Sequence, residues 1–164
     1  MTTGYPILEQ IAQAIETRLG NVTTANSYQQ TISVKRPTRM GEVWTPENNL
    51  VLLLQGDTQR SEDNEYEAFP LVYAWEQQFA IQIFTVPSER DTTPIEQLAN
   101  VTTADVVTAL TSPAATWHTW TNLSIDSEVT DISTDLADDG SWHVTQITLT
   151  VTYRTPFNNP YTVA

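Results

Sequence analysis

Hydrophobic and polar positions follow two different periods along this chain of 164 residues. Near its start, isoleucine recurs at every fourth position, at Ile7, Ile11 and Ile15, with polar residues between. This spacing predicts an amphipathic helix from Pro6 to Leu19. Proline suits the first helical position, and Gly20 is expected to end the helix in the left-handed conformation.

Three stretches after this helix predict strands. Residues 28–34 alternate, and the short apolar run Leu50–Leu54 suits a strand that is covered on both faces. Residues 71–86 alternate over a longer distance, and Glu76 is among the polar residues on one side. The apolar side of that stretch consists of Leu71, Tyr73, Trp75, Phe79, Ile81 and Ile83. We expect the 50–54 strand to pair with it.

The second half of the chain predicts one more helix and a hairpin. Thr102 lies three residues before Asp105, a spacing typical of a capping box at a helix start. Two strands are expected after it, from Leu123 to about Ile132 and from Trp142 to Thr155, joined by a turn at Asp139-Gly140. The last strand turns six alternating residues to one face: His143, Thr145, Ile147, Leu149, Val151 and Tyr153.

The expected elements come in the order α-β-β-β-α-β-β. This order is typical of an α+β fold, a single mostly antiparallel sheet flanked by two helices. No repeat or linker divides the chain, so we expect residues 1–164 to form one domain.

A short arm at residues 156–164 follows the last strand. Pro156 lacks the N–H that a strand ladder needs, so the strand is expected to stop there. The arm carries two aromatic residues, Phe157 and Tyr161. Two interpretations stay open: the arm folds back over its own domain, or it reaches a neighbouring subunit with Phe157 and Tyr161 as anchors.

Charge restricts the partners of this protein. Twenty Asp and Glu against seven Lys and Arg give a formal net charge of -13, which disfavours binding to DNA or to an anionic membrane. The chain contains no cysteine, which excludes disulfides and thiolate metal sites. Its first residues lack a signal-peptide pattern, and no stretch is apolar enough to span a bilayer. We therefore expect a soluble protein made in the cytosol.

The sequence contains no arrangement typical of catalysis or cofactor binding. Two acidic stretches, at residues 57–67 and 126–139, lack the regular spacing of a calcium loop, and a solvated loop and a turn account for them. His118 and His143 have no serine nearby in a nucleophile context. We expect no enzyme activity, metal or cofactor. An acidic carbohydrate-active enzyme that uses paired carboxylates, with Glu76 as one candidate, remains an alternative.

Two groups of residues are candidates for protein contacts. Lys35, Arg36 and Arg39 form a basic tip that could meet an acidic face of an identical neighbour, although a solvated loop explains it as well. Trp117 and Trp120 lie in the threonine-rich segment "ATWHTWTN". These two tryptophans are either core residues or interface anchors.

The layout resembles the tail terminator, or tail completion, proteins of long-tailed bacteriophages. The similar parts are the opening helix "ILEQIAQAIETRLG" with the basic turn after the next strand, the helix "TTADVVTAL", and the ending "ITLTVTYRTPFNNPYTV". The acidic stretch 126–139 departs from this pattern. The resemblance implies a non-enzymatic structural protein of the virion neck, assembled in the host cytoplasm.

The same resemblance implies particular partners. Proteins of that family form a homo-oligomeric, hexameric ring on the last ring of tail tube protein, where they dock the head connector and completion proteins. Tail sheath is a further possible partner, and DNA passes through the ring without specific binding. Another neck or baseplate component of a phage particle is the alternative within the same class.

Overall fold

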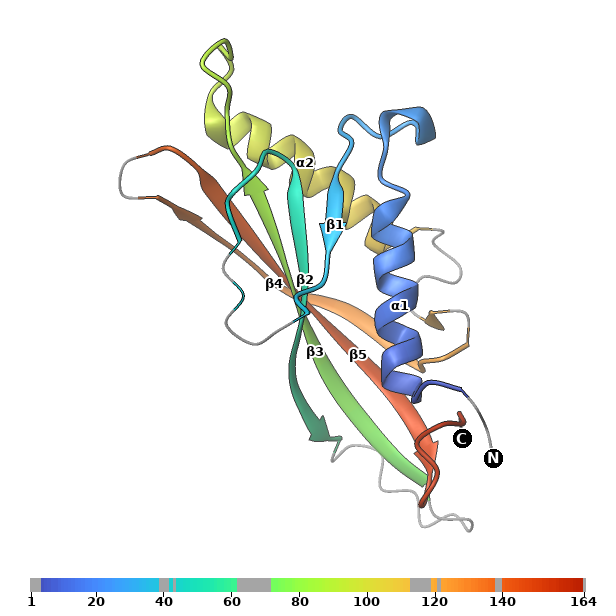
Figure 1. Ribbon diagram of the computed structural model, residues 1–164. Coiled ribbons are helices and arrows are strands. Elements are labelled where there is room, and N and C mark those ends of the chain that lie inside the picture. Colours follow the sequence, from blue (N-terminus) through green and yellow to red (C-terminus); the bar gives the residue numbers. More distant parts are fainter. Residues whose placement is uncertain are drawn as a thin grey trace.

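The computed structural model describes residues 4–38, 42, 44–61, 72–112, 119–120, 122–137 and 140–163. The described residues form two helices, α1 (Ile7–Gly20) and α2 (Ile95–Leu110), together with a short 3-10 helix, η1 (Thr24–Asn26), and five strands. The strands are β1 (Ser33–Lys35), β2 (Leu50–Arg60), β3 (Val72–Thr85), β4 (Asp126–Leu136) and β5 (His143–Pro156). This order confirms the predicted α+β class. Figure 1 shows the long strands in a twisted sheet beside the two helices.

The five strands form one sheet in the order β1-β2-β3-β5-β4. Only β1 and β2 run parallel, and the other three neighbouring pairs are antiparallel. The longest ladder joins β3 to β5 and runs without a register shift from Val72 opposite Pro156 to Thr85 opposite His143. As predicted, β2 pairs with β3, and the last two strands are neighbours. The strand β4 lies at one edge of the sheet.

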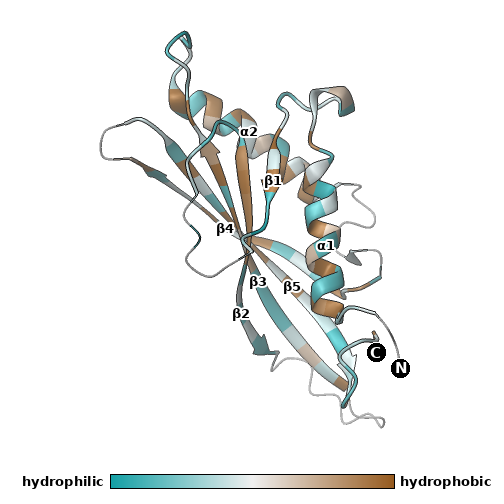
Figure 2. Cartoon of the chain, in the orientation of Figure 1, coloured by the Kyte–Doolittle hydropathy of each residue, from teal (hydrophilic) through white to brown (hydrophobic). Residues whose placement is uncertain are grey.

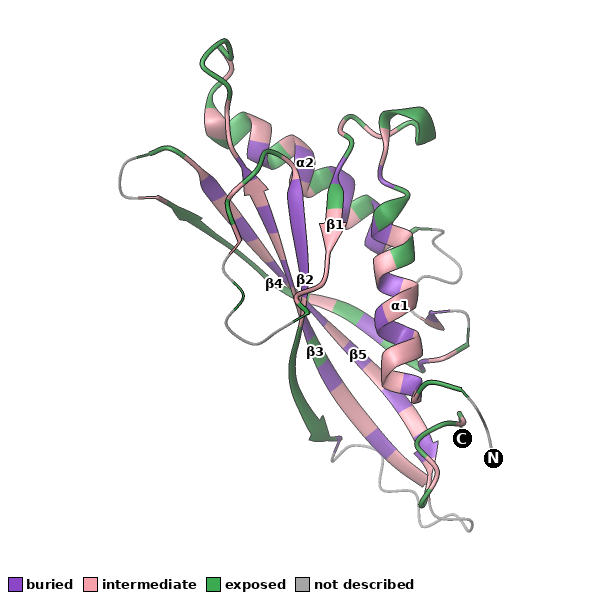
Figure 3. Ribbon diagram, in the orientation of Figure 1, coloured by how far each residue is buried: buried purple, intermediate pink, exposed green. Residues whose placement is uncertain are grey.

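The core lies between the helices and one face of this sheet. The apolar sides of α1 and α2 pack with buried residues of β2, β3 and β5 in a single cluster that includes Ile11, Ile15, Leu19, Val106, Leu110, Val51, Phe79, Ile81, Ile147 and Leu149. All six alternating residues predicted for the last strand are buried. Figure 3 shows this alternation along β5, and Figure 2 shows the apolar residues gathered where the sheet meets the helices. Burial of these side chains is the main stabilising contribution to the fold.

The strand β2 changes character along its length. Leu50, Val51, Leu52 and Leu53 are all buried, so both faces of its first half are covered, as the apolar run predicted. Residues from Gln55 onward are exposed, although β2 continues to Arg60. A register shift between Gln55 and Thr58 separates the two halves. The strand is therefore longer than the five apolar residues indicated.

The predicted capping box at Thr102 is wrong. Helix α2 begins seven residues earlier, at Ile95, directly after Pro94. Thr102 is buried in the middle of the helix, and its hydroxyl donates to Leu98 O at 3.2 Å. The Asp105 carboxylate accepts from the backbone N–H of Gln30 at 2.7 Å instead of capping its own helix. A tertiary contact therefore uses the side chain that the local pattern assigned to the helix end.

Three other predicted boundaries also need correction. Gly20 is the last residue of α1 and has no left-handed backbone, since Gly140 is the glycine with positive φ among the described residues. The first strand covers Ser33–Lys35 instead of residues 28–34, since the N–H groups of Gln30 and Ile32 donate to the Asp105 carboxylate and to Val22 O instead of to a neighbouring strand. Strand β4 is shifted toward the C-terminus relative to the predicted 123–132.

Candidate interaction surfaces

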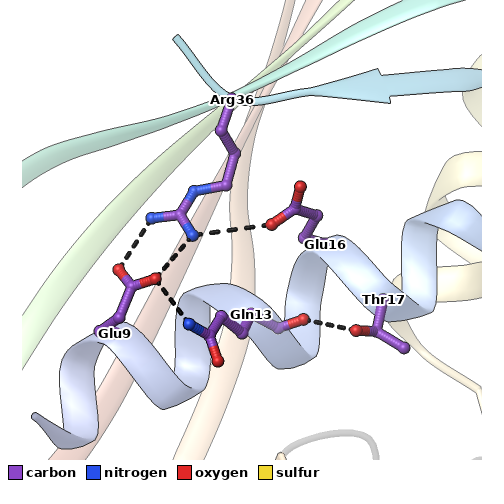
Figure 4. A network of polar contacts seen from close by, with 5 residues as sticks. All are labelled: Glu9, Gln13, Glu16, Thr17 and Arg36. Carbon is purple, nitrogen blue, oxygen red and sulfur yellow. Dashed lines mark hydrogen bonds and ion pairs between the residues drawn. The ribbon is translucent and has the colours of Figure 1, made fainter. Parts of the chain in front are cut away.

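Arg36, predicted as part of a basic tip, is held by helix α1 of its own chain. Its Nη1 and Nη2 each lie 2.9 Å from an oxygen of Glu9, and Nη1 also lies 3.6 Å from Glu16 (Figure 4). Gln13 donates to the same Glu9 carboxylate at 3.0 Å. This paired geometry matches the planar fork of a guanidinium to a carboxylate. It ties the segment after β1 to the polar side of α1.

The pKa values of both partners respond to this contact. The hydrogen bond from Arg36 lowers the pKa of Glu9 below its ordinary value, although partial burial acts in the opposite direction. The hydrogen bond to Glu9 correspondingly raises the pKa of Arg36. Each shift favours the charged form of its group, so both side chains are ionised at neutral pH.

Lys35, another residue of the predicted basic tip, makes a different contact. Lys35 Nζ lies 5.1 Å from the centre of the Trp44 ring, a cation–π arrangement. Arg39 lies outside the described residues. Because Arg36 is already neutralised by Glu9 and Glu16, the structure leaves less positive charge at this tip than the sequence indicated.

Trp120 is a core residue. It is fully buried, and its Nε1 donates to Ser127 Oγ at 2.6 Å, which satisfies its polar atom. On the other side the Arg18 guanidinium lies 4.0 Å from the ring centre and donates to Leu110 O at 3.3 Å. Burial lowers the pKa of Arg18. Of the two interpretations for Trp120, the core one describes its position; Trp117 and His118 lie outside the described residues.

The C-terminal arm folds back against its own domain. Pro160 O accepts from the backbone N–H of Ile7 at 2.9 Å, so the arm contacts the start of α1. The Phe157 ring lies 5.5 Å from the Tyr73 ring, within the range of aromatic pairing. Figure 1 shows the two chain ends close together. Even so, Phe157 and Tyr161 keep 46% and 42% of their surface exposed.

Three aromatic residues and one valine in the two segments joined by this contact remain exposed. We call them the terminal patch; they are Tyr5, Phe157, Tyr161 and Val163, which are between 42% and 62% exposed. Tyr5 precedes the Ile7 that bonds to the arm, and its carbonyl accepts from Gln10. The sequence indicated Phe157 and Tyr161 but not Tyr5, which belongs to the patch only because the two ends meet.

Along β3, β5 and β4, the sheet face opposite the helices is mostly polar and carries several carboxylates together with Arg154. We call it the open face. Glu76, Asp126 and Glu128 line one shallow groove there, with neighbouring threonines and Gln78. Glu76 accepts from Gln59 Nε2 at 3.2 Å and from Ser61 Oγ at 3.0 Å, so it links β3 to the end of β2. Asp131 and Asp135 continue the acidic track along β4.

The histidine and the acidic stretches that were considered for catalysis or metal binding are placed as follows. His143 is buried at the start of β5, opposite Thr85, and its Nδ1 has no hydrogen-bond partner among the described residues. Within the described part of the chain, no three His, Cys, Asp or Glu side chains are placed to hold a metal ion. The acidic residues at 62–67 and the turn residues Asp138 and Asp139 lie outside it. None of its helices is long and apolar enough to cross a membrane.

Two groups of residues escaped the sequence analysis. Glu9 and Glu16, the partners of Arg36, are seven residues apart and share one side of α1, a spacing that signals a common partner. Ile132 and Leu136 are nearly half exposed on β4. Their alternation with acidic residues predicts a strand but not which strand lies at the edge. No family model matches this chain, and a search of curated proteins finds no significant match.

Proposed function

We propose that this chain is a structural, non-enzymatic phage assembly protein that caps the tail tube as a homo-oligomeric, hexameric ring and offers a docking surface to the head connector. The observation that carries the proposal is the terminal patch. Aromatic side chains that remain exposed together are characteristic of surfaces that bind other proteins. Here they lie on a backbone that hydrogen bonds hold in place, which lowers the entropic cost of association.

The open face supports a further part of the proposal, that DNA passes through the ring without being bound. Among the described residues of β3, β5 and β4, five carboxylates and one arginine lie on this face: Glu76, Asp126, Glu128, Asp131, Asp135 and Arg154. Such a surface repels phosphate groups and does not retain nucleic acid. A ring that turns this face toward its channel would let DNA slide past.

The first experiment measures assembly. We expect purified protein to form particles several times the 18.4 kDa chain mass, alone or with tail tube protein from the same genome, by light scattering after gel filtration. Electron microscopy should then show rings at the ends of tubes. Tail terminator proteins can be monomeric before assembly, so a monomeric mass measured without tube protein does not contradict the proposal. A protein that stays monomeric and leaves tube length unchanged would overturn the proposal.

A pair of variants tests the terminal patch directly. Tyr5→Ser with Tyr161→Ser removes two exposed rings and should prevent assembly while leaving the thermal unfolding of the monomer nearly unchanged. Ile125→Ser is the control, because Ile125 is also an exposed apolar residue, at 41%, but belongs neither to the terminal patch nor to the described strands. Equal assembly by the double variant and the control would show that the patch is not the contact.

The groove on the open face favours one other candidate, the acidic carbohydrate-active enzyme. Glu76 and Glu128 line the same groove, as a glycosidase with paired acids requires. Turnover on a panel of glycans, abolished by Glu76→Gln without loss of fold, would support this activity. No turnover on any glycan would remove it. Another neck or baseplate component remains the alternative that the assembly experiment with tube protein separates.

A further inference from the structure

The strand β4 has a free edge in the described structure. It pairs with β5 on one side, and no described strand lies on the other. Eleven residues form it, and every residue from Thr130 to Leu136 is exposed, as Figure 3 shows along this strand. Edges of this length usually template the addition of another strand unless something blocks them.

The backbone of β4 presents unused hydrogen-bonding groups along this edge. Ala137 donates to Trp142 O at 3.0 Å, and the register pairs Leu136 with His143 and Asp135 with Val144. In an antiparallel ladder, bonded and non-bonded pairs alternate. The backbone groups of Ile132, Thr134 and Leu136 therefore point away from β5, toward the space that an added strand would occupy. The Leu136 N–H already donates to Asp135 Oδ1 at 2.9 Å, so the N–H groups open to an added strand are those of Ile132 and Thr134.

The side chains of β4 divide by charge between its two faces. Asp126, Glu128, Asp131 and Asp135 lie on the open face, opposite Thr152, Thr150, Thr148 and Val144 of β5. On the helix side, Ile132 and Leu136 lie opposite Ile147 and His143 and are 47% and 46% exposed. No Lys or Arg occurs within β4. One face of the edge is therefore acidic and the other is apolar.

We propose that β4 binds an extended segment of another protein in which Lys or Arg alternates with aliphatic residues. Such a segment adds a sixth strand to the sheet: its backbone bonds to Ile132, Thr134 and the Leu136 carbonyl, its basic residues face the carboxylates, and its aliphatic residues cover Ile132 and Leu136. A second copy of β4 is a poor occupant, because antiparallel self-pairing brings the carboxylates of both copies onto one face. The proposal does not depend on the ring function.

The test uses end-capped peptides of about nine residues, the length of a typical strand. A peptide that alternates Lys with Val should bind, as measured by fluorescence anisotropy at about 0.15 M salt. A peptide with the same residues in an order that breaks the alternation should bind much more weakly. The same alternating peptide with N-methyl groups on every second amide cannot pair as a strand, and it should lose binding altogether.

Two measurements on the protein locate the site. Asp131→Asn with Asp135→Asn should weaken binding about fivefold, as expected for the loss of two exposed charge pairs. Glu89→Gln with Glu96→Gln, which changes net charge equally at exposed positions away from β4, should leave binding within twofold of the unmodified protein. Hydrogen exchange at the amides of Ile132 and Thr134 should slow when the peptide is bound.

Several results would overturn the proposal. Equal binding by the scrambled or N-methylated peptide would mean that charge alone attracts the peptide and that no strand is added. Equal weakening by both charge variants would place the peptide elsewhere. Absence of binding would mean that the carboxylates of β4 only protect the edge against association.

Discussion

The contact between Arg36 and Glu9 predicts that Arg36 stabilises the fold of its own chain, and a double-mutant cycle tests this directly. We expect a double-mutant cycle with Arg36→Gln and Glu9→Gln to give a coupling free energy of about 1 kcal/mol at pH 7. Exposed ion pairs contribute about 0.2–1 kcal/mol, and the upper end applies because two parallel bonds of 2.9 Å join side chains that are only 26% and 29% exposed. Urea unfolding followed by tryptophan fluorescence measures each corner of the cycle.

The pH dependence of this coupling has a definite sign. Arg36 lowers the pKa of Glu9 in the folded state, so the stabilisation is complete above the unfolded pKa of Glu9. It decreases as the pH falls through the lower, folded pKa, and the cycle should show a smaller coupling at about pH 3 than at pH 7. Arg90→Gln on an exposed turn is the control and should change stability by less than about 0.5 kcal/mol. A coupling near zero at pH 7, or one that does not change with pH, would refute this assignment.

Two further substitutions and one deletion test other parts of the structure. Trp120→Phe should cost about 1–3 kcal/mol of unfolding free energy, because it leaves the buried Ser127 hydroxyl without its 2.6 Å donor; a loss below about 0.5 kcal/mol by urea unfolding would contradict this bond. Gly20→Ala should raise stability by about 0.4–1 kcal/mol, since a Cβ there meets no atom within 4 Å; a comparable decrease would mean that Gly20 is left-handed after all. Deletion of residues 157–164 should lower the stability of the monomer by about 1–3 kcal/mol, because the Ile7–Pro160 hydrogen bond and the Phe157–Tyr73 contact are lost. Calorimetry measures this change. An unchanged stability would favour an arm that binds a neighbouring subunit.

Local patterns predicted the elements of this protein better than their ends. The period of two is long in β3 and β5, with Gln77 as the one polar residue among the inward positions of β3 from Tyr73 to Ile83, so both strands lie within a residue or two of the predicted positions. The start of α2 was missed because Thr102 and Asp105 have the spacing of a helix cap, yet tertiary partners, Asn49 and Gln30, engage both side chains. A capping box is a local pattern of residues within one helical turn. It therefore contains no information about a competing partner that is distant in the sequence, such as Asn49 or Gln30.

The candidate contact residues show the same limit. Trp120 could be a core residue or an anchor on sequence grounds, and only the position of Ser127 and Arg18 around its ring places it in the core. Arg36 was chosen for its charge among basic neighbours. Its carboxylate partners lie on a helix that ends before β1 begins, so their contact depends on how α1 packs beside the sheet.

The sequence by itself determined the α+β class, the alternation of the long strands and the strongly acidic charge, because these depend on composition and on residue spacing within single elements. Only the tertiary structure decided the strand order, and with it that the acidic strand β4 lies at the edge of the sheet. It also decided that the two chain ends meet in the terminal patch and that Arg36 binds α1. These features arise from contacts between distant segments, which burial of the shared core brings together and which no local period encodes.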